Sequence, residues 1–128
     1  MTVAAQSDDY GTVTPYFTVD DPDALIAFAQ TVFDAELIKI NRYETGVVQH
    51  ARLRIGDTMI MLNQSTEAFA AQVSQMHILV QDADQVFAHA VAAGAEGIMQ
   101  PNLRPHGDRM AGVKDPCGNI WWIASRLP

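Results

Sequence analysis

The chain has 128 residues, of which 48% are apolar and 18% charged, a composition typical of one soluble globular domain. Its net charge of −7 disfavours nucleic acid as a partner, because an acidic surface repels a phosphate backbone. No apolar run approaches the roughly 20 residues of a membrane span, and residues 1–11 lack the basic and apolar segments of a secretory signal. A single cysteine cannot form an internal disulfide, so a cytoplasmic location is expected.

The first half of the chain predicts a strand, a helix and three further strands. After a short flexible leader over residues 1–11, apolar and polar residues alternate across 12–19, which is the period of a half-buried strand. Asp20-Asp21-Pro22 predicts a helix start, because an acidic cap precedes a proline in the first turn. Further strands are expected at 36–43, 47–55 and 58–63, followed by a linker over 64–74.

The same order of elements begins again after the linker. Val80-Gln81-Asp82 repeats Val19-Asp20-Asp21 at a separation of 61 residues, and Gly94 predicts the end of a second helix. The strands of this half are expected at 75–80, 97–100, 110–114 and 119–126, with a loop over 101–107.

This repeat predicts an α+β fold of two tandem β-α-β-β-β modules, 12–63 and 75–126, within one domain over 12–128. The helix of each module covers one face of its sheet and leaves the other face bare. The two bare faces are expected to form a curved mixed sheet around a trough, which is a natural site for a small molecule.

Four motifs identify a family that the chain resembles. They are Val13-Thr14-Pro15-Tyr16, the stretch from His50 to Asp57, Gly107-Asp108-Arg109, and Asp115-Pro116-Cys117-Gly118-Asn119-Ile120-Trp121. With the repeat, they resemble the vicinal oxygen chelate superfamily of glyoxalases, bleomycin resistance proteins and extradiol dioxygenases, and within it the PhnB-like branch. The resemblance implies a fold and a homodimer, but it does not imply one reaction, because this fold hosts several chemistries.

The resemblance also implies where a divalent metal would bind. Metal-dependent members use one side chain from the first and the last strand of each half. Carried over, these positions fall on Thr14, on Arg52 (or His50 if the register slips by two), on His77 and on Trp122. Only histidine among these is an ordinary ligand, so no metal cofactor is expected; if one binds, it would use His77 and His50.

Several side chains of the expected trough are candidates for ligand binding. His77 lies in an apolar strand, where it is either a base or ligand contact or a structural histidine. Arg52 shares a face with His50, where it could hold a carboxylate or phosphate, although a solvated outer face would also explain it. The candidate catalytic residues are His77 and Arg52. The full set of candidate ligand-binding residues is Thr14, Tyr16, His50, Arg52, Met61, His77, Asp108, Arg109 and Trp122.

Three functions remain open from the sequence. The first is a metal-independent protein of the glyoxalase/bleomycin resistance type that binds a small organic ligand in the trough. The second is an enzyme, such as a lyase, isomerase or dioxygenase-type member, with His77 as base and Arg52 as clamp or with a nonstandard metal. The third is a dimeric scaffold with a vestigial pocket. The ligand and the pathway stay open.

Overall fold

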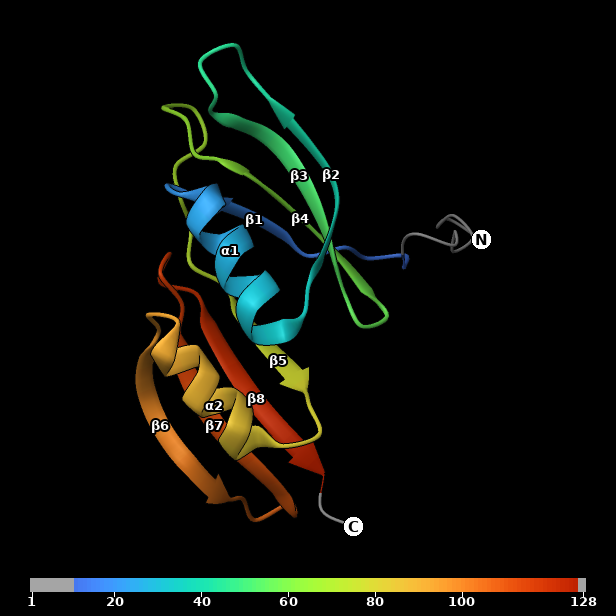
Figure 1. Cartoon of the computed structure of the whole chain (residues 1–128), viewed down its shortest axis with the longest axis vertical. Coiled ribbons are helices and arrows are strands. Elements are labelled where there is room, and N and C mark those ends of the chain that lie inside the picture. The colour runs from blue at the N-terminus through green and yellow to red at the C-terminus, as the bar shows by residue number, and fades with distance from the viewer. Residues whose placement is uncertain (1–10, 127–128) are drawn as a thin grey trace.

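The computed structural model describes residues 11–126, so most of the leader expected over 1–11 lies outside the described residues. The order of elements is the predicted β-α-β-β-β repeat (Figure 1). Module 1 contains β1 (Tyr16–Val19), α1 (Pro22–Phe33), β2 (Glu36–Arg42), β3 (Val48–Ile55) and β4 (Thr58–Gln64). Module 2 contains β5 (Gln75–Leu79), α2 (Ala83–Ala92), β6 (Glu96–Leu103), β7 (Asp108–Lys114) and β8 (Ile120–Arg126).

Both helices begin at the predicted aspartates. The Asp21 carboxylate accepts the backbone N–H of Ala24 at 3.1 Å, and Pro22 occupies the first turn. Asp82 does the same for α2, accepting the N–H of Gln85 at 3.1 Å. These caps satisfy backbone donors that a helix leaves unpaired, so the repeated aspartate sets the same boundary in both modules.

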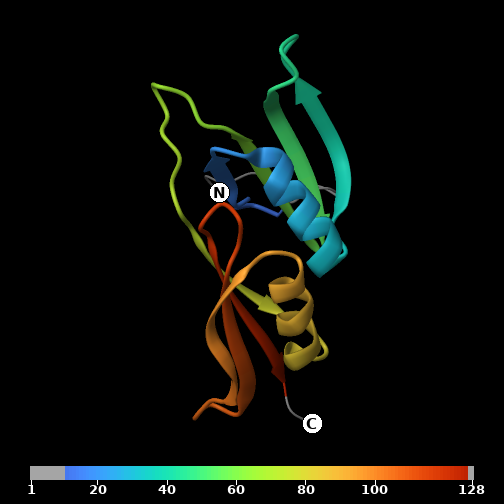
Figure 2. The same cartoon turned by 60° about the vertical axis from the view of Figure 1, so that its left-hand side comes forward.

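Each module forms its own four-stranded mixed sheet. The strand orders are β1-β4-β3-β2 and β5-β8-β7-β6, in which the first strand is parallel to the last and the remaining pairs are antiparallel. The fold class predicted from the sequence is thereby confirmed. Figure 2 shows the two modules arranged along the long axis, with the segment between β4 and β5 passing from one to the other.

Three strand boundaries differ from the sequence prediction by more than one residue: the starts of β1 and β7 and the end of β6. The strand expected over 12–19 begins only at Tyr16. The carbonyl of Pro15 still accepts the Met61 N–H of β4 at 2.9 Å, but proline has no N–H to donate, so the ladder does not extend past it. The loop expected over 101–107 is shorter, since β6 continues to Leu103. β6 lies at a sheet edge and is irregular there, which is where a strand tolerates a proline such as Pro101.

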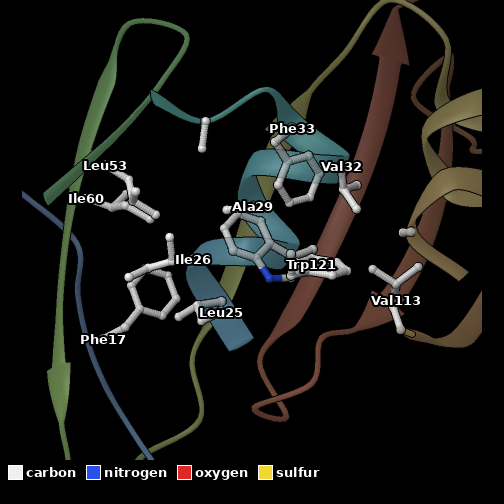
Figure 3. Packing of buried hydrophobic residues seen from close by; sticks show 14 of the residues in the cluster. Phe17, Leu25, Ile26, Ala29, Val32, Phe33, Leu53, Ile60, Val113 and Trp121 are labelled. Atoms are coloured by element: carbon white, nitrogen blue, oxygen red, sulfur yellow. The ribbon is translucent and has the colours of Figure 1, made fainter. Parts of the chain in front are cut away.

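One hydrophobic core serves both modules. It consists of the side chains on the helix-covered faces of the two sheets together with the inward faces of α1 and α2. Trp121 of β8 is 3% exposed and lies at the junction, with its ring stacked on Phe17 of β1 at a centroid distance of 6.0 Å and tilted against Phe33 of α1 at 4.8 Å. Figure 3 shows this indole among residues of module 1, so the modules are joined by packing.

A buried carboxylate holds that indole in place. Asp115, in the turn before β8, is 4% exposed, and its Oδ2 accepts the Trp121 Nε1–H at 2.8 Å. Its Oδ1 accepts the backbone N–H groups of Cys117 and Asn119 at 2.8 and 3.0 Å. Asn119, itself fully buried, accepts the N–H of Ser74 from the linker at 2.9 Å. The turn therefore connects β8, the linker and the shared core.

Within residues 11–126, neither helix is long and apolar enough to cross a lipid bilayer.

Replacing Asp115 by alanine is expected to destabilise the fold by about 3 kcal/mol or more, because it leaves several buried N–H donors without an acceptor. Asp57→Ala is the matched control, since Asp57 occupies the corresponding turn of module 1, is exposed and, among residues 11–126, accepts a hydrogen bond only from the Thr58 hydroxyl. That change should cost within about 0.5 kcal/mol. Urea unfolding followed by circular dichroism measures both, and equal midpoints for the two variants would contradict this account of the turn.

Candidate functional site

The bare face of each sheet is the face that its helix leaves uncovered. In module 1 it carries a row of side chains in direct register across the sheet: Tyr16, Met61, Arg52 and Lys39. Their neighbours in the strands, such as Phe17 and Leu53, are fully buried on the opposite face. The alternation that placed Arg52 on a polar face is therefore confirmed, and this face presents an aromatic ring, a thioether and two cations.

His50 lies on the same bare face, close to Tyr16. The two rings are 5.9 Å apart between centroids and tilted by 49°. Thr18 and Asn63 form the neighbouring row, in which the Thr18 hydroxyl donates to the Asn63 side-chain carbonyl at 2.8 Å. The structure thus brings together Tyr16, His50 and Arg52, three residues proposed from the sequence.

The bare face of module 2 carries the equivalent row, which consists of His77, Trp122, Gly112 and Met99 in register. Trp122 is half-buried, and its Nε1–H donates to the Gln75 side-chain oxygen at 2.9 Å. The opposite orientation of Trp121 and Trp122 follows from the period of a strand, and the burial of Trp121 confirms it.

Gly112 makes room for the Trp122 ring. A β-carbon at this position would lie 2.6 Å from Cζ3 and 2.9 Å from Cε3 of the indole, so a side chain there would displace the ring. The indole therefore lies against the sheet backbone, held at its edge by Gln75. Sequence analysis missed Gly112 and Gln75, although a lone glycine within a strand pattern is a signal for the close approach of another group.

The internal repeat corrects the positions at which the family's metal ligands were placed. Thr14 lies before β1, and Arg52 lies on β3, the third strand of its module. The pair that corresponds to His77 and Trp122 is Tyr16 on β1 and Met61 on β4. The placement implied by the resemblance put the last-strand position on Arg52, which lies one strand before the last strand of module 1.

The corrected positions do not fit a divalent metal. A phenol, a thioether and an indole accompany one imidazole, and only the imidazole is an ordinary ligand of such ions. Across residues 11–126 no group of three or more histidine, cysteine, aspartate or glutamate side chains is placed to hold a metal ion. His50 and His77 lie on different sheets, so they do not make up the missing set within one module.

Asp108 and Arg109 lie away from the row formed by His77 and Trp122. Arg109 pairs in register with Ser125 near the end of β8, and its Nε–H donates to the Asp84 carboxylate of α2 at 2.8 Å. Asp108 lies 3.6 Å from the His106 ring, measured between Oδ2 and Nε2. Arg109 thus ties β7 to the start of α2 through a surface ion pair, which is a structural role.

Burial is the main cause that lowers the pKa of His50 below its ordinary value of 6.5, and the positive charges of Arg52 and Lys39 lower it further. His50 is therefore neutral near pH 7. A neutral imidazole can accept a proton or a hydrogen bond from a molecule bound on this face.

The family is shown by comparison with known sequences and structures. The profile of the Glyoxalase/Bleomycin resistance protein/Dioxygenase superfamily matches residues 11–123, so the chain belongs to this superfamily. An uncharacterized protein of Mycobacterium tuberculosis H37Rv is 30% identical over 122 residues, which cover 85% of this chain and 71% of the relative.

Solved structures agree with this assignment. TioX from Micromonospora sp. ML1 has 26% identity and a TM-score of 0.77, with 91% of this chain and 100% of TioX covered. A PhnB protein from Bacillus cereus has 16% identity and a TM-score of 0.67, and the match covers 90% of this chain and 99% of the PhnB protein. This likeness shows the shared fold.

Acidification is expected to weaken the fold through His50. Because its pKa is lower in the folded than in the unfolded chain, the stability it contributes is complete above about pH 6.5 and is lost as the pH falls through the folded pKa. NMR titration of the ring should give a midpoint below 6.5 in the wild type. Arg52→Gln should raise that midpoint only in part, because burial is the larger cause. A midpoint at or above 6.5 in the wild type would refute this assignment.

Proposed function

We propose that this protein binds a small, flat organic molecule on the bare faces of its sheets, without a metal ion. The observation that carries this proposal is the Trp122 platform, an indole lying over Gly112 and bonded to Gln75. An aromatic ring that is already held in place loses little freedom when a ligand stacks on it. A ring held this way and left half-buried is what a site for stacking requires.

The face of module 1 supplies complementary groups. Arg52 can form paired hydrogen bonds with a carboxylate or phosphate, and Tyr16 and His50 add a second aromatic surface beside it. Tyr16 and Arg52 are in register through Met61, so they reach the same bound molecule. The ligand class that fits both faces is a flat ring system that carries an acidic group. We also propose the PhnB-like branch that the sequence motifs predict, which the fold shared with the PhnB protein from Bacillus cereus supports.

Enclosing such a ligand requires the two bare faces to meet, and we propose that a homodimer brings them together. In one chain the modules share a core through their helix-covered faces, and the bare faces stay open: Tyr16 is 50% and Leu79 52% exposed. A groove between the two modules is lined by His77 but by none of Tyr16, His50, Arg52 or Trp122. Pairing of two copies would cover these apolar side chains and complete the trough.

His50 favours a second candidate, which is proton transfer on the same faces by a lyase or an isomerase. Its neutral state near pH 7 and its position beside Arg52 are those of a base next to an anion-binding group. His77, the base proposed from the sequence, lies beside Trp122 on the other face. A substrate consumed by the wild type and not by His50→Gln would establish this candidate.

A screen of flat heteroaromatic acids by NMR is expected to yield compounds that shift the indole N–H signal of Trp122 and leave that of the buried Trp121 in place. Trp122→Ala should weaken their binding at least tenfold, about 1.4 kcal/mol. Gly112→Ala should weaken it as well, because it displaces the indole. Phe69→Ala, which removes a 73% exposed ring from the linker, is the control and should bind normally. Equal affinity of Trp122→Ala and the wild type would refute the platform.

Light scattering on the purified protein should give twice the mass of one chain. Leu79→Glu places a charge on the bare face of module 2 and should shift the mass to that of a single chain. Val91→Glu is the matched control, since Val91 is an exposed apolar residue of α2, and its mass should stay at that of the pair. A wild-type protein that is monomeric at high concentration would overturn the proposed trough.

A further inference from the structure

A second candidate site lies in a groove of about 620 Å³ between the two modules, along the free edge of β5. This inter-module groove is bounded by the end of α1, the β3–β4 turn, the free edge of β5 and the start of α2. Its volume is within the range of small-molecule sites. The lining residues that the argument uses are Phe33, Asp34, Asp57, Ile78, Asp82 and Val86.

The floor of the groove is apolar. Phe33 of α1 belongs to the shared core, and Ile78 of β5 and Val86 of α2 pack against that core while also lining the groove. At the groove, part of the core between the two modules is therefore exposed to solvent. An apolar group placed there would be removed from water on most sides.

The rim of the groove is acidic. Asp34, Asp57 and Asp82 come from three different elements, and all three are exposed. No lysine or arginine lines the groove, and within residues 11–126 none of the three aspartates forms an ion pair. A positive charge in the groove would be attracted by carboxylates from three elements, within a chain whose net charge is already −7.

The edge of β5 adds hydrogen-bond acceptors to the groove. β5 is an edge strand that pairs with β8 alone in the described sheet. Ser74 and Val80 bond to β8 through the Ser74 carbonyl and the Val80 N–H. A parallel ladder uses alternate residues of a strand, so His77 and Leu79 direct their backbone groups away from β8. Their carbonyls are available to an N–H donor in the groove.

We propose that the inter-module groove binds a small organic cation, with an ammonium or amidinium head at the acidic rim and an apolar body on the floor. The rim carboxylates and the β5 carbonyls accept hydrogen bonds from the head, and the opening of the core receives the body. His77 and Leu79 border both the groove and the bare face of module 2, but the three carboxylates and the apolar floor belong to the groove and not to that face. The proposal therefore neither requires the function proposed for the bare faces nor supports it.

The test uses 4-phenylbutylammonium as probe and the alcohol 4-phenylbutan-1-ol as its neutral counterpart, titrated into the full chain and followed by amide NMR. We expect the cation to bind at least tenfold more tightly than the alcohol and to shift the amide signals of His77, Leu79 and Gln85. Equal affinities, which would indicate an apolar slot or an edge for an uncharged peptide strand, would overturn the proposal. Amide shifts confined to Gly112 and Trp122 would also overturn it, because they would place the cation on the bare face of module 2.

A matched pair of triple variants locates the charge effect. Asp34→Asn, Asp57→Asn and Asp82→Asn together keep the shape of the rim, and asparagine suits both the helix cap at Asp82 and the left-handed backbone of Asp34 at φ 55°. This triple should lose at least tenfold in affinity for the cation. The control triple Glu44→Gln, Glu67→Gln and Glu96→Gln changes the net charge equally at exposed positions outside the groove, and should lose less than twofold. Equal losses of affinity in the two triples would show that the net charge of the chain causes the effect, and would refute the site.

Discussion

The hydrogen bond between the Asp115 carboxylate and the Trp121 indole is the contact on which the arrangement of the two modules depends. Trp121 packs against Phe17 and Phe33 of module 1, although it belongs to module 2. Asp115 fixes the orientation of that ring and, through Asn119, the path of the linker at Ser74. Because this network is buried, its donors and acceptors have no water to replace a lost partner.

This junction decides which surfaces are left for binding. Since the modules share a core through their helix-covered faces, both bare faces stay open to solvent and the seam between the modules remains as a groove. The bare faces carry arginine, histidine and aromatic side chains, whereas the rim of the groove carries carboxylates. The two surfaces of the chain therefore differ in the charge of their side chains.

Much of the fold could be predicted because local patterns repeat along the chain. The aspartates that cap both helices, the alternation through Arg52 and the opposite faces of Trp121 and Trp122 follow from backbone geometry alone. The strand boundary at Tyr16 and the pairing of Tyr16 with Met61 were missed, because register depends on which strand lies beside which. The ion pair between Arg109 and Asp84 of α2 likewise depends on the tertiary structure, because the two residues lie 25 positions apart in the sequence.

The sequence by itself determined the repeated order of elements and the face on which each strand residue lies, since these depend on spacing of two or three to four residues. Its motifs also carry the resemblance to the superfamily. Only the tertiary structure decided that Gly112 lies beneath Trp122, that Tyr16 meets His50, and that three aspartates from separate elements surround one groove. The physical reason is that such sites are made by contacts between residues far apart in the chain. Their positions follow from strand register and from how the modules pack, and neither has a periodic signal in the sequence.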